Sequence, residues 1–474
     1  MSIMSLETLE KKLKEDLESI EYPPISWKLP KKSDRYDVVI VGAGMAGLTA
    51  AFALKQVGIS HLHLFDARPE HSEGPWNTYA RMKTLRSGKD LMGPALGIPH
   101  LTFKAWYKAQ FGSDLWEQLY KIPTHQWMEY LDWYRHVLKL PVSNNHTLVD
   151  IKTEDEVLRL TFLYQNQKVI KSCHKLILAT GREGLGGLEY PAFLKGLPKN
   201  VYAHTAEAID FCAMKDKCLG VLGVGASAFD ATATALEHGA GHVDMFMRRD
   251  HIPSVNKLAS LTYPGFSYGY YHLPDELKVK FFENHEEVGS PPPFESLDRI
   301  ASHKNLQLYP GIFIHAAEYL DEKIILHTNK GTKQYDFLIL GTGFKIDLSR
   351  SSEIKTFHKQ ISLWKDHLML PHRLGQFPYL GPHFQFVENH PGQALFLKNI
   401  YCFNYAATLS HGLLSSDIPG ISVGATRLAQ GIASDFFVEN ASCYLQLLKN
   451  YHVEEFKTDS PPEAKIKFMY DLEL

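Results

Sequence analysis

The sequence predicts an α/β fold with two dinucleotide-binding domains of the Rossmann kind, the second inserted into the first. Glycine-rich turns occupy 42–47 and 223–228, and each stands between an apolar strand and an Ala-rich helix. Two further apolar segments, 175–181 and 336–344, end in small residues and flank the second turn. One such turn is weak evidence, because glycines also serve ordinary tight turns. Two indicate a pair of bound nucleotides, and therefore flavin and nicotinamide redox chemistry.

The composition is that of a large globular protein. The 474 residues are 45% apolar and 22% charged, which argues against disorder. A net charge of −3 gives no general attraction to nucleic acid or anionic membranes. No apolar run approaches the roughly 20 residues of a membrane span, and the Lys- and Glu-rich start is unlike a secretory signal. We therefore expect a cytoplasmic protein with a small-molecule substrate and no membrane or nucleic-acid partner; homo-oligomerisation is left open.

The amino terminus predicts a docking helix. Leu6, Leu9, Leu13 and Leu17 recur at helical spacing, so one face of this segment is apolar. We assign 1–33 to a helical extension that packs on the main body.

The cysteines and histidines give no metal or disulfide motif. There are five cysteines and 24 histidines, without C-x-x-C or H-E-x-x-H spacing. Reduced thiols are expected and no metal is assigned. A dithiol mechanism is disfavoured, although folding could bring Cys212 and Cys218 together.

The first nucleotide unit has the order that FAD binding requires. A buried strand at 36–41 leads into the turn, and a helix follows over 48–57. The turn glycines let the backbone approach a pyrophosphate at the helix N-terminus; they are Gly42, Gly44 and Gly47. The next strand, 61–65, ends at Asp66, where a carboxylate can accept hydrogen bonds from the adenosine ribose.

The second unit repeats this order with one chemical difference. Its cofactor-binding residues are predicted to be Gly223, Gly225 and Ser227. The strand at 242–247 ends in Arg248 and Arg249, which can pair with a ribose 2′-phosphate that an acid would repel. NADPH is therefore favoured over NADH. The alternative is that Arg249 pairs with Asp250 and only one arginine faces the cofactor.

The two strands that end in small residues predict that the chain passes close to the cofactors at these points. The residues concerned are Thr180 and Gly181 in the first, and Gly341 and Gly343 in the second. We assign 34–199 to the first part of the FAD domain and 200–334 to the NADPH domain. The range 335–474 then holds the second part of the FAD domain and a C-terminal tail.

These motifs resemble the flavoprotein monooxygenases with two dinucleotide domains, a class B-like superfamily. It includes flavin-containing, Baeyer–Villiger and N-hydroxylating enzymes. The segment 336–344 resembles their D-x-x-x-L-A-T-G-Y element, with Gly341 for Ala and Phe344 for Tyr. The stretch 404–415 is similar to the H-G-L…L-L-S stretch of the N-hydroxylating branch.

Other motifs depart from the named branches. The Baeyer–Villiger fingerprint is only loosely matched by Phe193, Gly196 and His204, whose spacing is wrong. Residues 82–91 give no clean counterpart of the N-hydroxylating enzymes' substrate segment. The branch is left unassigned.

The resemblance implies that NADPH reduces FAD, that O2 adds at the flavin C4a as a peroxide, and that one oxygen atom reaches a small organic substrate. The reaction would be an N-, S- or Baeyer–Villiger oxidation. The cofactor carries the difficult chemistry, so no protein nucleophile is required. A helix starting near residues 416–420, with Pro419 suited to its first turn, could direct its dipole at the flavin, and Asp417 is assigned to the cofactor-binding residues.

An insert at 74–140 holds five of the seven tryptophans: Trp76, Trp106, Trp116, Trp127 and Trp133. Trp127, Tyr130 and Tyr134 share a helical face after the predicted cap Thr124. Core packing explains this face, and an aromatic wall over the flavin is the functional alternative. Trp76 is the flavin-contact candidate. The other catalytic candidates are Arg81, Lys89 and Asn256, while His204 and His411 are expected to be structural.

Three hypotheses about function follow. The first is an FAD- and NADPH-dependent monooxygenase. The second is an electron-transfer reductase that oxygenates nothing. The third is a non-catalytic redox sensor that keeps both folds.

Overall fold

The computed structural model describes residues 5–25, 27, 35–154 and 157–452. They divide into two units, Met1–Ile432 and Ala433–Leu474. The first unit holds both dinucleotide-binding domains. The second holds the end of helix α12 (Ile421–Glu439) and helix α13 (Ala441–Lys449). The tail predicted at the carboxyl end falls largely on 453–474, outside the described residues.

The first domain is built on a seven-stranded sheet in the order β3-β2-β1-β6-β5-β4, with β17 also paired to β6. Its strands are β1 (Tyr36–Val41), β2 (Leu62–Phe65), β3 (Val142–Ser143), β4 (Thr147–Glu154), β5 (Val157–Tyr164), β6 (Gln167–Leu178) and β17 (Ile400–Cys402). The carboxyl half of β6 runs parallel to β1 and β17, and its first half is antiparallel to β5. Strand β1 is apolar throughout its second half because it lies at the buried centre of the sheet.

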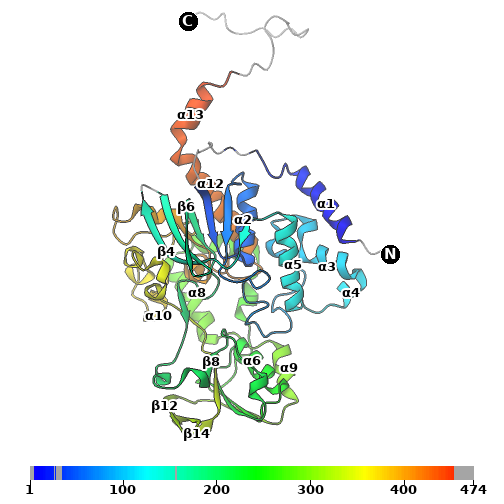
Figure 1. The fold of residues 1–474 in the computed structure, drawn as a ribbon, viewed down its shortest axis with the longest axis vertical. Coiled ribbons are helices and arrows are strands. Elements are labelled where there is room, and N and C mark those ends of the chain that lie inside the picture. Colours follow the sequence, from blue (N-terminus) through cyan, green and yellow to red (C-terminus); the bar gives the residue numbers. More distant parts are fainter. Residues whose placement is uncertain (1–4, 26, 28–34, 155–156, 453–474) are drawn as a thin grey trace, which may run out of the picture. The chain divides into compact units, whose positions relative to one another are not determined.

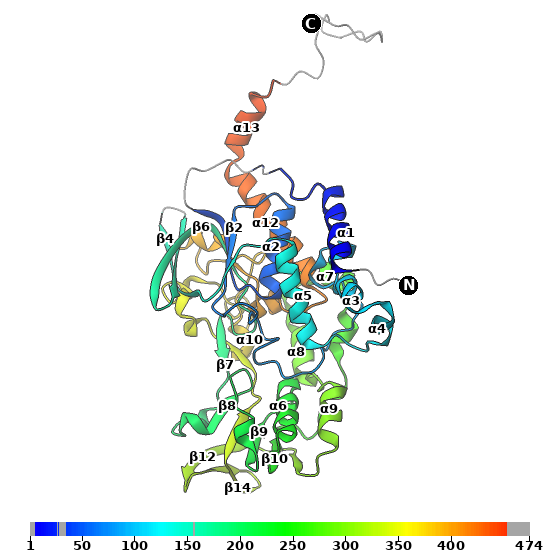
Figure 2. The ribbon, with the colours of Figure 1, turned by 45° about the vertical axis from the view of Figure 1, so that its right-hand side comes forward.

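The second domain is built on a five-stranded sheet in the order β11-β10-β9-β15-β8, in which every pairing is parallel. Its strands are β8 (Tyr202–His204), β9 (Cys218–Leu222), β10 (His242–Phe246), β11 (Leu306–Tyr309) and β15 (Phe337–Leu340). Helices α6 (Ala226–Glu237) and α9 (Phe294–Ala301) pack together, and an antiparallel sheet joins β12 (Ile314–Leu320), β13 (Lys323–Thr328) and β14 (Gly331–Tyr335). Figures 1 and 2 show these elements in one body, in green to yellow-green.

The chain crosses between the domains twice, side by side. Strand β7 (Gly186–Leu188) leads into the second domain and pairs antiparallel with β16 (Phe344–Ile346), which leads out of it. This double connection confirms the predicted two-domain fold with the second domain inserted.

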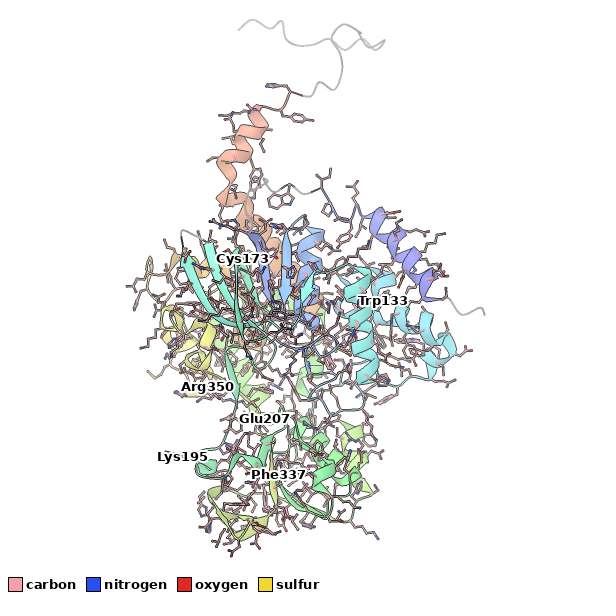
Figure 3. The ribbon with its side chains drawn as sticks, in the orientation of Figure 1. Trp133, Cys173, Lys195, Glu207, Phe337 and Arg350 are labelled. Carbon is pink, nitrogen blue, oxygen red and sulfur yellow. The ribbon has the colours of Figure 1, made fainter. Side chains whose placement is uncertain are left out.

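The predicted boundary at 335 needs correction. The segment 337–340, which the sequence placed in the second part of the FAD domain, pairs with β9 and β8 in the second sheet. Phe337 packs against the core of that domain and lies in the same body as Lys195 and Glu207 (Figure 3). The pattern of β15, a buried apolar run with a Gly-rich end, matches that of β6. Pattern alone therefore could not decide to which sheet it belongs.

Part of the range 200–334 packs on the first domain. Helices α7 (Pro264–Gly269) and α8 (Asp275–Val288) belong to this stretch. The Tyr270 hydroxyl donates to the Leu409 carbonyl at 3.4 Å, and the Tyr271 ring stacks on His411. We name residues 264–288 the returning arm.

The amino-terminal helix is present as predicted and docks on the Trp-rich insert. Helix α1 (Leu6–Ser19) buries Leu9 and Leu13. It packs against α3 (Phe103–Phe111), and the Trp133 indole donates to Glu10 at 3.0 Å. The insert also contains α4 (Ser113–Gln118) and α5 (Thr124–Val137); α5 lies between α3 and α2 (Met45–Gln56) in both views (Figures 1 and 2).

The structure gives the starts of two predicted helices. Thr124 is the first residue of α5 and not its cap, since its hydroxyl donates to the Met82 carbonyl at 2.8 Å. The helix expected near Ser416 is α12, which begins at Ile421, so Asp417 lies in the preceding turn. The other helices are the short α10 (His372–Gly375) and α11 (Thr408–His411). Within the described residues, no helix is long and apolar enough to span a membrane.

Candidate functional site

The first glycine turn has the geometry of a pyrophosphate cradle. Gly42 has φ +102°, and its N–H donates to the Phe65 carbonyl at 2.8 Å. A Cβ added at Gly47 would overlap the carbonyl oxygen of Gly42, so only glycine allows this close contact between turn and helix. Gly44 caps α2 without a side-chain hydrogen bond, which leaves the first N–H groups of the helix available to an anion. These residues fit FAD.

Asp66 is placed at the end of β2, as expected, but it also holds the turn. Its Oδ2 accepts from the Ala43 N–H at 2.7 Å, and its Oδ1 accepts from the Arg68 N–H at 2.8 Å. Each carboxylate oxygen keeps a further lone pair. Contact with the FAD ribose therefore remains a prediction for this residue.

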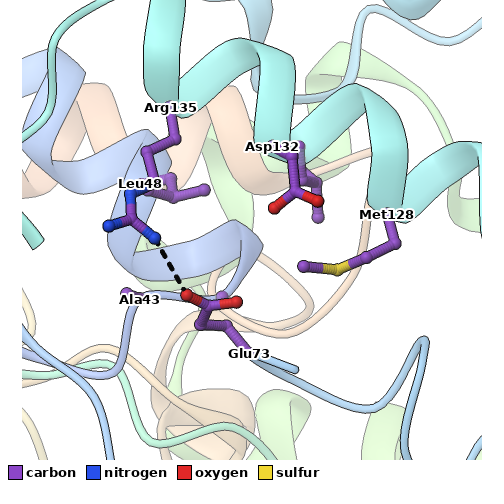
Figure 4. Close-up of a pocket in the computed structure, with 8 residues that line it drawn as sticks. Ala43, Leu48, Glu73, Met128, Asp132 and Arg135 are labelled. Atoms are coloured by element: carbon purple, nitrogen blue, oxygen red, sulfur yellow. Dashed lines mark hydrogen bonds and ion pairs between the residues drawn. The ribbon is translucent and has the colours of Figure 1, made fainter. Parts of the chain in front are cut away.

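A buried acid behind the turn was missed by the sequence analysis. Glu73 accepts through Oε1 from Asn144 at 2.7 Å and from Arg135 at 3.1 Å, while its Oε2 has no hydrogen-bond partner among the described residues. It faces a cavity of about 10 Å³, against Ala43 and Gly44 (Figure 4). That space suits one water molecule. Burial raises the pKa of Glu73. No spacing in the sequence distinguished this residue from a surface glutamate.

The ends of β6 and β17 are joined beside the first turn. Asn404 is fully buried, and its amide donates to Thr180 Oγ1 and to the Leu178 carbonyl, each at 3.1 Å. The Tyr405 N–H donates to the Gly181 carbonyl at 3.2 Å. Thr180 and Gly181 are thus held at the carboxyl edge of the sheet, where ligands of parallel α/β sheets bind.

The second glycine turn repeats the first. Gly223 has φ +104°, and its N–H donates to the Phe246 carbonyl at 2.9 Å. A Cβ on Gly341 would overlap the Ala228 side chain, so β15 and α6 approach closely. Gly225 caps α6 without a side-chain bond, and Ser227 in its first turn is exposed. This cradle fits NADPH.

The two arginines after β10 have different environments. Arg249 donates to the carbonyls of Glu287 and Val288 at the end of α8. Arg248 is exposed and has no hydrogen bond or ion pair with the described residues. Arg248 alone is therefore the free candidate for a 2′-phosphate. The sequence left open whether one or both arginines faced the cofactor.

Gly343 lies where the chain leaves the second domain. Its carbonyl accepts from the Glu189 N–H and from His204 Nε2, each at 3.0 Å. His411 is fully buried, bonds the Gly381 carbonyl at 3.0 Å and stacks on Phe384. Burial lowers the pKa of both histidines, and both have structural partners.

Two of the catalytic candidates are held by main-chain carbonyls. Arg81 donates to the carbonyls of Thr205 and Glu207 in the second domain, and burial lowers its pKa to about 10. Lys89 donates to the Trp116 carbonyl at 2.7 Å and lies over that indole ring. These hydrogen bonds hold separate parts of the fold together, so they do not support a catalytic role for Arg81 or Lys89. Asn256 is the N-cap residue of the short 3-10 helix Lys257–Leu261, makes no side-chain hydrogen bond to it, and is half-buried.

Trp76 lies directly beside the first turn. Gly74 approaches Gly44 closely, and the half-buried Trp76 ring meets the Trp127 ring edge-on, with 6.4 Å between centroids. The Trp127 Nε1–H is buried without a partner. Trp106, Trp116, Tyr130 and Tyr134 are almost fully buried, so most of the aromatic insert is core. Flavin contact by Trp76 remains a prediction.

Asp417 belongs to a cluster that the sequence did not predict. Burial raises its pKa, while the positive charges of Arg182 and Arg86 oppose that shift. Its Oδ1 accepts from the Ile418 N–H at 3.0 Å. The charges of one residue from the insert and one from the turn after β6 thus act on a single carboxylate, in the turn before α12.

All five cysteines are free. Cys173 and Cys402 are buried, and burial raises the pKa of both thiols, which keeps them protonated and unreactive. Cys218 begins β9, at the opposite end of that strand from the coenzyme turn. These positions give no support to a dithiol beside the flavin.

There are two glycine cradles, one on each of two domains, and the second domain is inserted into the first. This arrangement defines a flavoprotein that takes electrons from a nicotinamide coenzyme. The comparisons agree. A family model described as pyridine nucleotide-disulphide oxidoreductase matches residues 39–290. The chain is 35% identical over 462 residues to the FAD-dependent urate hydroxylase of Xanthomonas campestris, covering 96% of this chain and 98% of that protein. This chain belongs to the pyridine nucleotide-disulphide oxidoreductase family and, within it, groups with this FAD-dependent hydroxylase.

Solved structures share the fold. Ornithine hydroxylase from Pseudomonas aeruginosa aligns with a TM-score of 0.69 at 15% identity, over 84% of this chain and 99% of that chain. Ornithine N-hydroxylase from Kutzneria, with reduced FAD, NADP+ and L-ornithine, aligns with a TM-score of 0.66 at 15% identity, over 85% and 99%. The predicted fold and the flavin-dependent superfamily are confirmed, while NADPH as the particular pyridine nucleotide remains a prediction.

Proposed function

We propose that this protein is an FAD- and NADPH-dependent monooxygenase that hydroxylates a planar, nitrogen-rich heteroaromatic compound of the urate type. The observation that carries the proposal is the 35% identity with a urate hydroxylase along almost the whole of both chains. FAD-dependent oxygenation of a small substrate is the established part. The urate-type substrate is the proposed part, and ring hydroxylation adds to the N-, S- and Baeyer–Villiger reactions implied by the sequence.

The overall reaction balances with the two cofactors. Substrate, O2, NADPH and a proton give hydroxylated substrate, water and NADP+. FAD, when bound, supplies the chemistry that takes up hydride and activates oxygen. The protein's part is to hold the two nucleotides on Gly42–Gly47 and Gly223–Ala228 and to position the substrate between them.

The test is oxygen-isotope incorporation. The FAD-loaded protein is incubated with NADPH, 18O2 and urate, and the products are analysed by mass spectrometry. We expect one 18O atom per product molecule and NADPH consumption that depends on urate. Ornithine, cadaverine, a thioether and a ketone serve as alternative substrates in parallel.

A matched pair of variants ties this activity to the second cradle. In Gly223→Ala the new Cβ would overlap the Gly341 carbonyl, at a φ of +104°. Gly331 has a similar φ of +107°, lies on the β13–β14 hairpin and has open space around it. Gly223→Ala should lose labelled product while keeping FAD, and Gly331→Ala should keep both. Labelled product from another substrate, with none from urate, would refute the substrate assignment. NADPH-driven reduction of a quinone with no labelled product from any substrate would favour the reductase hypothesis.

A further inference from the structure

We propose that Arg86, Arg182 and His285 together form the binding site for the anionic form of a heteroaromatic substrate. This inference rests on the proposed function, which it deepens by naming the groups that recognise the substrate's charge. The three residues come from distant parts of the chain: the aromatic insert, the turn after β6, and helix α8.

Arg182 is the first part of the argument. It follows Gly181 at the carboxyl end of β6, where ligands of parallel sheets bind. Its guanidinium lies over the Tyr405 ring, 5.0 Å from the centroid, and it makes no hydrogen bond or ion pair with the described residues. The ring fixes the plane of the guanidinium and leaves its edge with five N–H donors for a ligand.

Arg86 provides a second cation at the same place. One of its nitrogens, Nη2, donates to the Pro291 carbonyl, which fixes the side chain across the domain boundary. Its charge and that of Arg182 both act on Asp417. Asp417 and Asp230 are the acids whose charges act on Arg86, and Asp230 is paired with Arg299 at 3.6 Å. Among the described residues neither Arg86 nor Arg182 has a carboxylate within ion-pair distance, so an anionic ligand would supply the counter-charge.

His285 adds a polar atom with no protein partner. Its Nδ1 is buried and makes no hydrogen bond in the described structure. A buried polar atom without a partner is costly, and ligand binding is one reason for such an atom to be retained. Burial lowers the pKa of His285, and the charges of Arg86 and Arg182 lower it further. The imidazole is therefore neutral near pH 7 and offers a hydrogen bond without another charge.

The returning arm explains why His285 reaches this cluster. Helix α8 belongs in sequence to the inserted domain, yet Tyr379 of the first domain donates to Asp275 at its start, at 2.9 Å. The carboxyl end of α8 is held by Arg249. The helix is thus fixed at both ends, to different parts of the fold, and His285 is carried in its last turn.

Urate has the chemistry that this cluster would bind. It is a planar anion whose edges alternate carbonyl oxygens and ring nitrogens. A guanidinium donates two parallel hydrogen bonds to such an edge, and these charge-assisted bonds are about twice as strong as neutral ones. A neutral heterocycle of the same shape would lose the charge interaction with the guanidinium groups.

The experiment compares Arg86→Gln, Arg182→Gln and His285→Asn with the wild-type holoenzyme. Binding of urate and of 1,3,7,9-tetramethylurate, which cannot ionise, is measured through the flavin absorption spectrum, and KM is measured for urate and NADPH. Each arginine variant should bind urate about 10- to 100-fold more weakly, with smaller changes for tetramethylurate and NADPH. His285→Asn keeps a polar atom and should weaken urate binding less. Arg159→Gln, which removes an exposed charge on β5, is the control and should change neither constant.

The outcomes separate this inference from the proposed function. If urate does not bind the wild type, orotate, nicotinate and xanthine are titrated in its place. An anion that binds, and binds more weakly to the arginine variants, would support the site while refuting the urate assignment. The site is overturned if no anion binds, or if the variants bind anions as the wild type does. It is also overturned if KM for NADPH or FAD content changes more than urate binding, since the arginines would then serve the cofactors.

Discussion

Arg248 and Arg249 are neighbours in sequence, but their guanidinium groups have different surroundings. Arg249 is bound to carbonyl groups at the end of α8, and Gly289 packs against it. Arg248 stays exposed at the carboxyl end of β10, beside the second glycine turn. A phosphate on the coenzyme ribose would therefore have one arginine available to it, and we expect preference for NADPH to depend on that single side chain.

Arg248→Ala should change coenzyme preference. Loss of a charge-assisted hydrogen bond costs about 1.5–3 kcal/mol, so kcat/KM for NADPH should fall roughly 10- to 100-fold. The value for NADH, which has no 2′-phosphate, should change little. Steady-state rates with both coenzymes measure the effect. Arg249→Ala is the control: it should loosen α8 and lower thermal stability without the same coenzyme-specific loss. Equal losses for both coenzymes in Arg248→Ala would contradict the assignment.

At the scale of elements, most of the tryptophan-rich insert is structural. Its rings contact one another in a connected aromatic core, and the Tyr130 and Tyr134 hydroxyls donate to the carbonyls of Leu101 and Pro94. Trp76 is different, because it lies beside the first glycine turn. The insert thus supports the FAD cradle from behind and directs one aromatic side chain to its rim.

Leu13→Ala tests the docking of α1. Leu13 is completely buried, so its truncation should cost about 2–5 kcal/mol of local stability. Amide hydrogen exchange over Leu6–Ser19 should become faster, while the glycine turns keep their protection. Ile20→Ala is the control. Ile20 is 52% exposed, so its truncation should cost less than about 0.5 kcal/mol. Unchanged exchange in Leu13→Ala would show that α1 does not depend on this contact.

At the scale of the whole molecule, further contacts join the domains besides those of the returning arm. The paired strands β7 and β16 form the covalent double connection. Residues 81–86 form a second link: Arg81 bonds carbonyls after β8, Thr84 bonds Glu295, and Lys83 pairs with Glu237 at 3.2 Å. Arg299 completes this link by donating to both Glu237 and the Arg81 carbonyl. The link sets the spacing between the two cradles.

Glu237 makes this link dependent on pH. The hydrogen bond from Arg299 lowers the pKa of Glu237 to about 2, from 4.5. A carboxyl group whose pKa is lowered by folding stabilises the folded state at pH values above its pKa in the unfolded chain. That stabilisation is lost as pH falls from 4.5 towards 2. Glu237→Gln should lower the free energy of unfolding near pH 7 by on the order of 1 kcal/mol, because the group is partly exposed, and the melting temperature should fall with it. The difference from wild type should shrink at about pH 3.

The control for this prediction is Glu318→Gln on strand β12, whose carboxylate is 58% exposed and pairs only with His327 among the described residues. It should leave the melting temperature unchanged across the same range. A Glu237→Gln difference that stays constant down to about pH 3 would show that the ion pair does not contribute as described.

The sequence by itself determined the two nucleotide units and their cofactors. Their signals are local: a strand, a turn with Gly42, Gly44 and Gly47, a helix and a second strand follow one another within one stretch of chain. Backbone sterics act over these short distances, so the residues can be recognised without knowing the rest of the fold. The amino-terminal helix was predictable for the same reason.

Only the tertiary structure decided where distant segments meet. It placed β15 in the second sheet, returned residues 264–288 to the first domain, and paired Glu73 with Arg135 behind the FAD cradle. It also gathered Arg86, Arg182, His285 and Asp417, which share no spacing. Contacts of this kind depend on which apolar surfaces pack together across the whole chain, and no periodicity in the sequence records that choice.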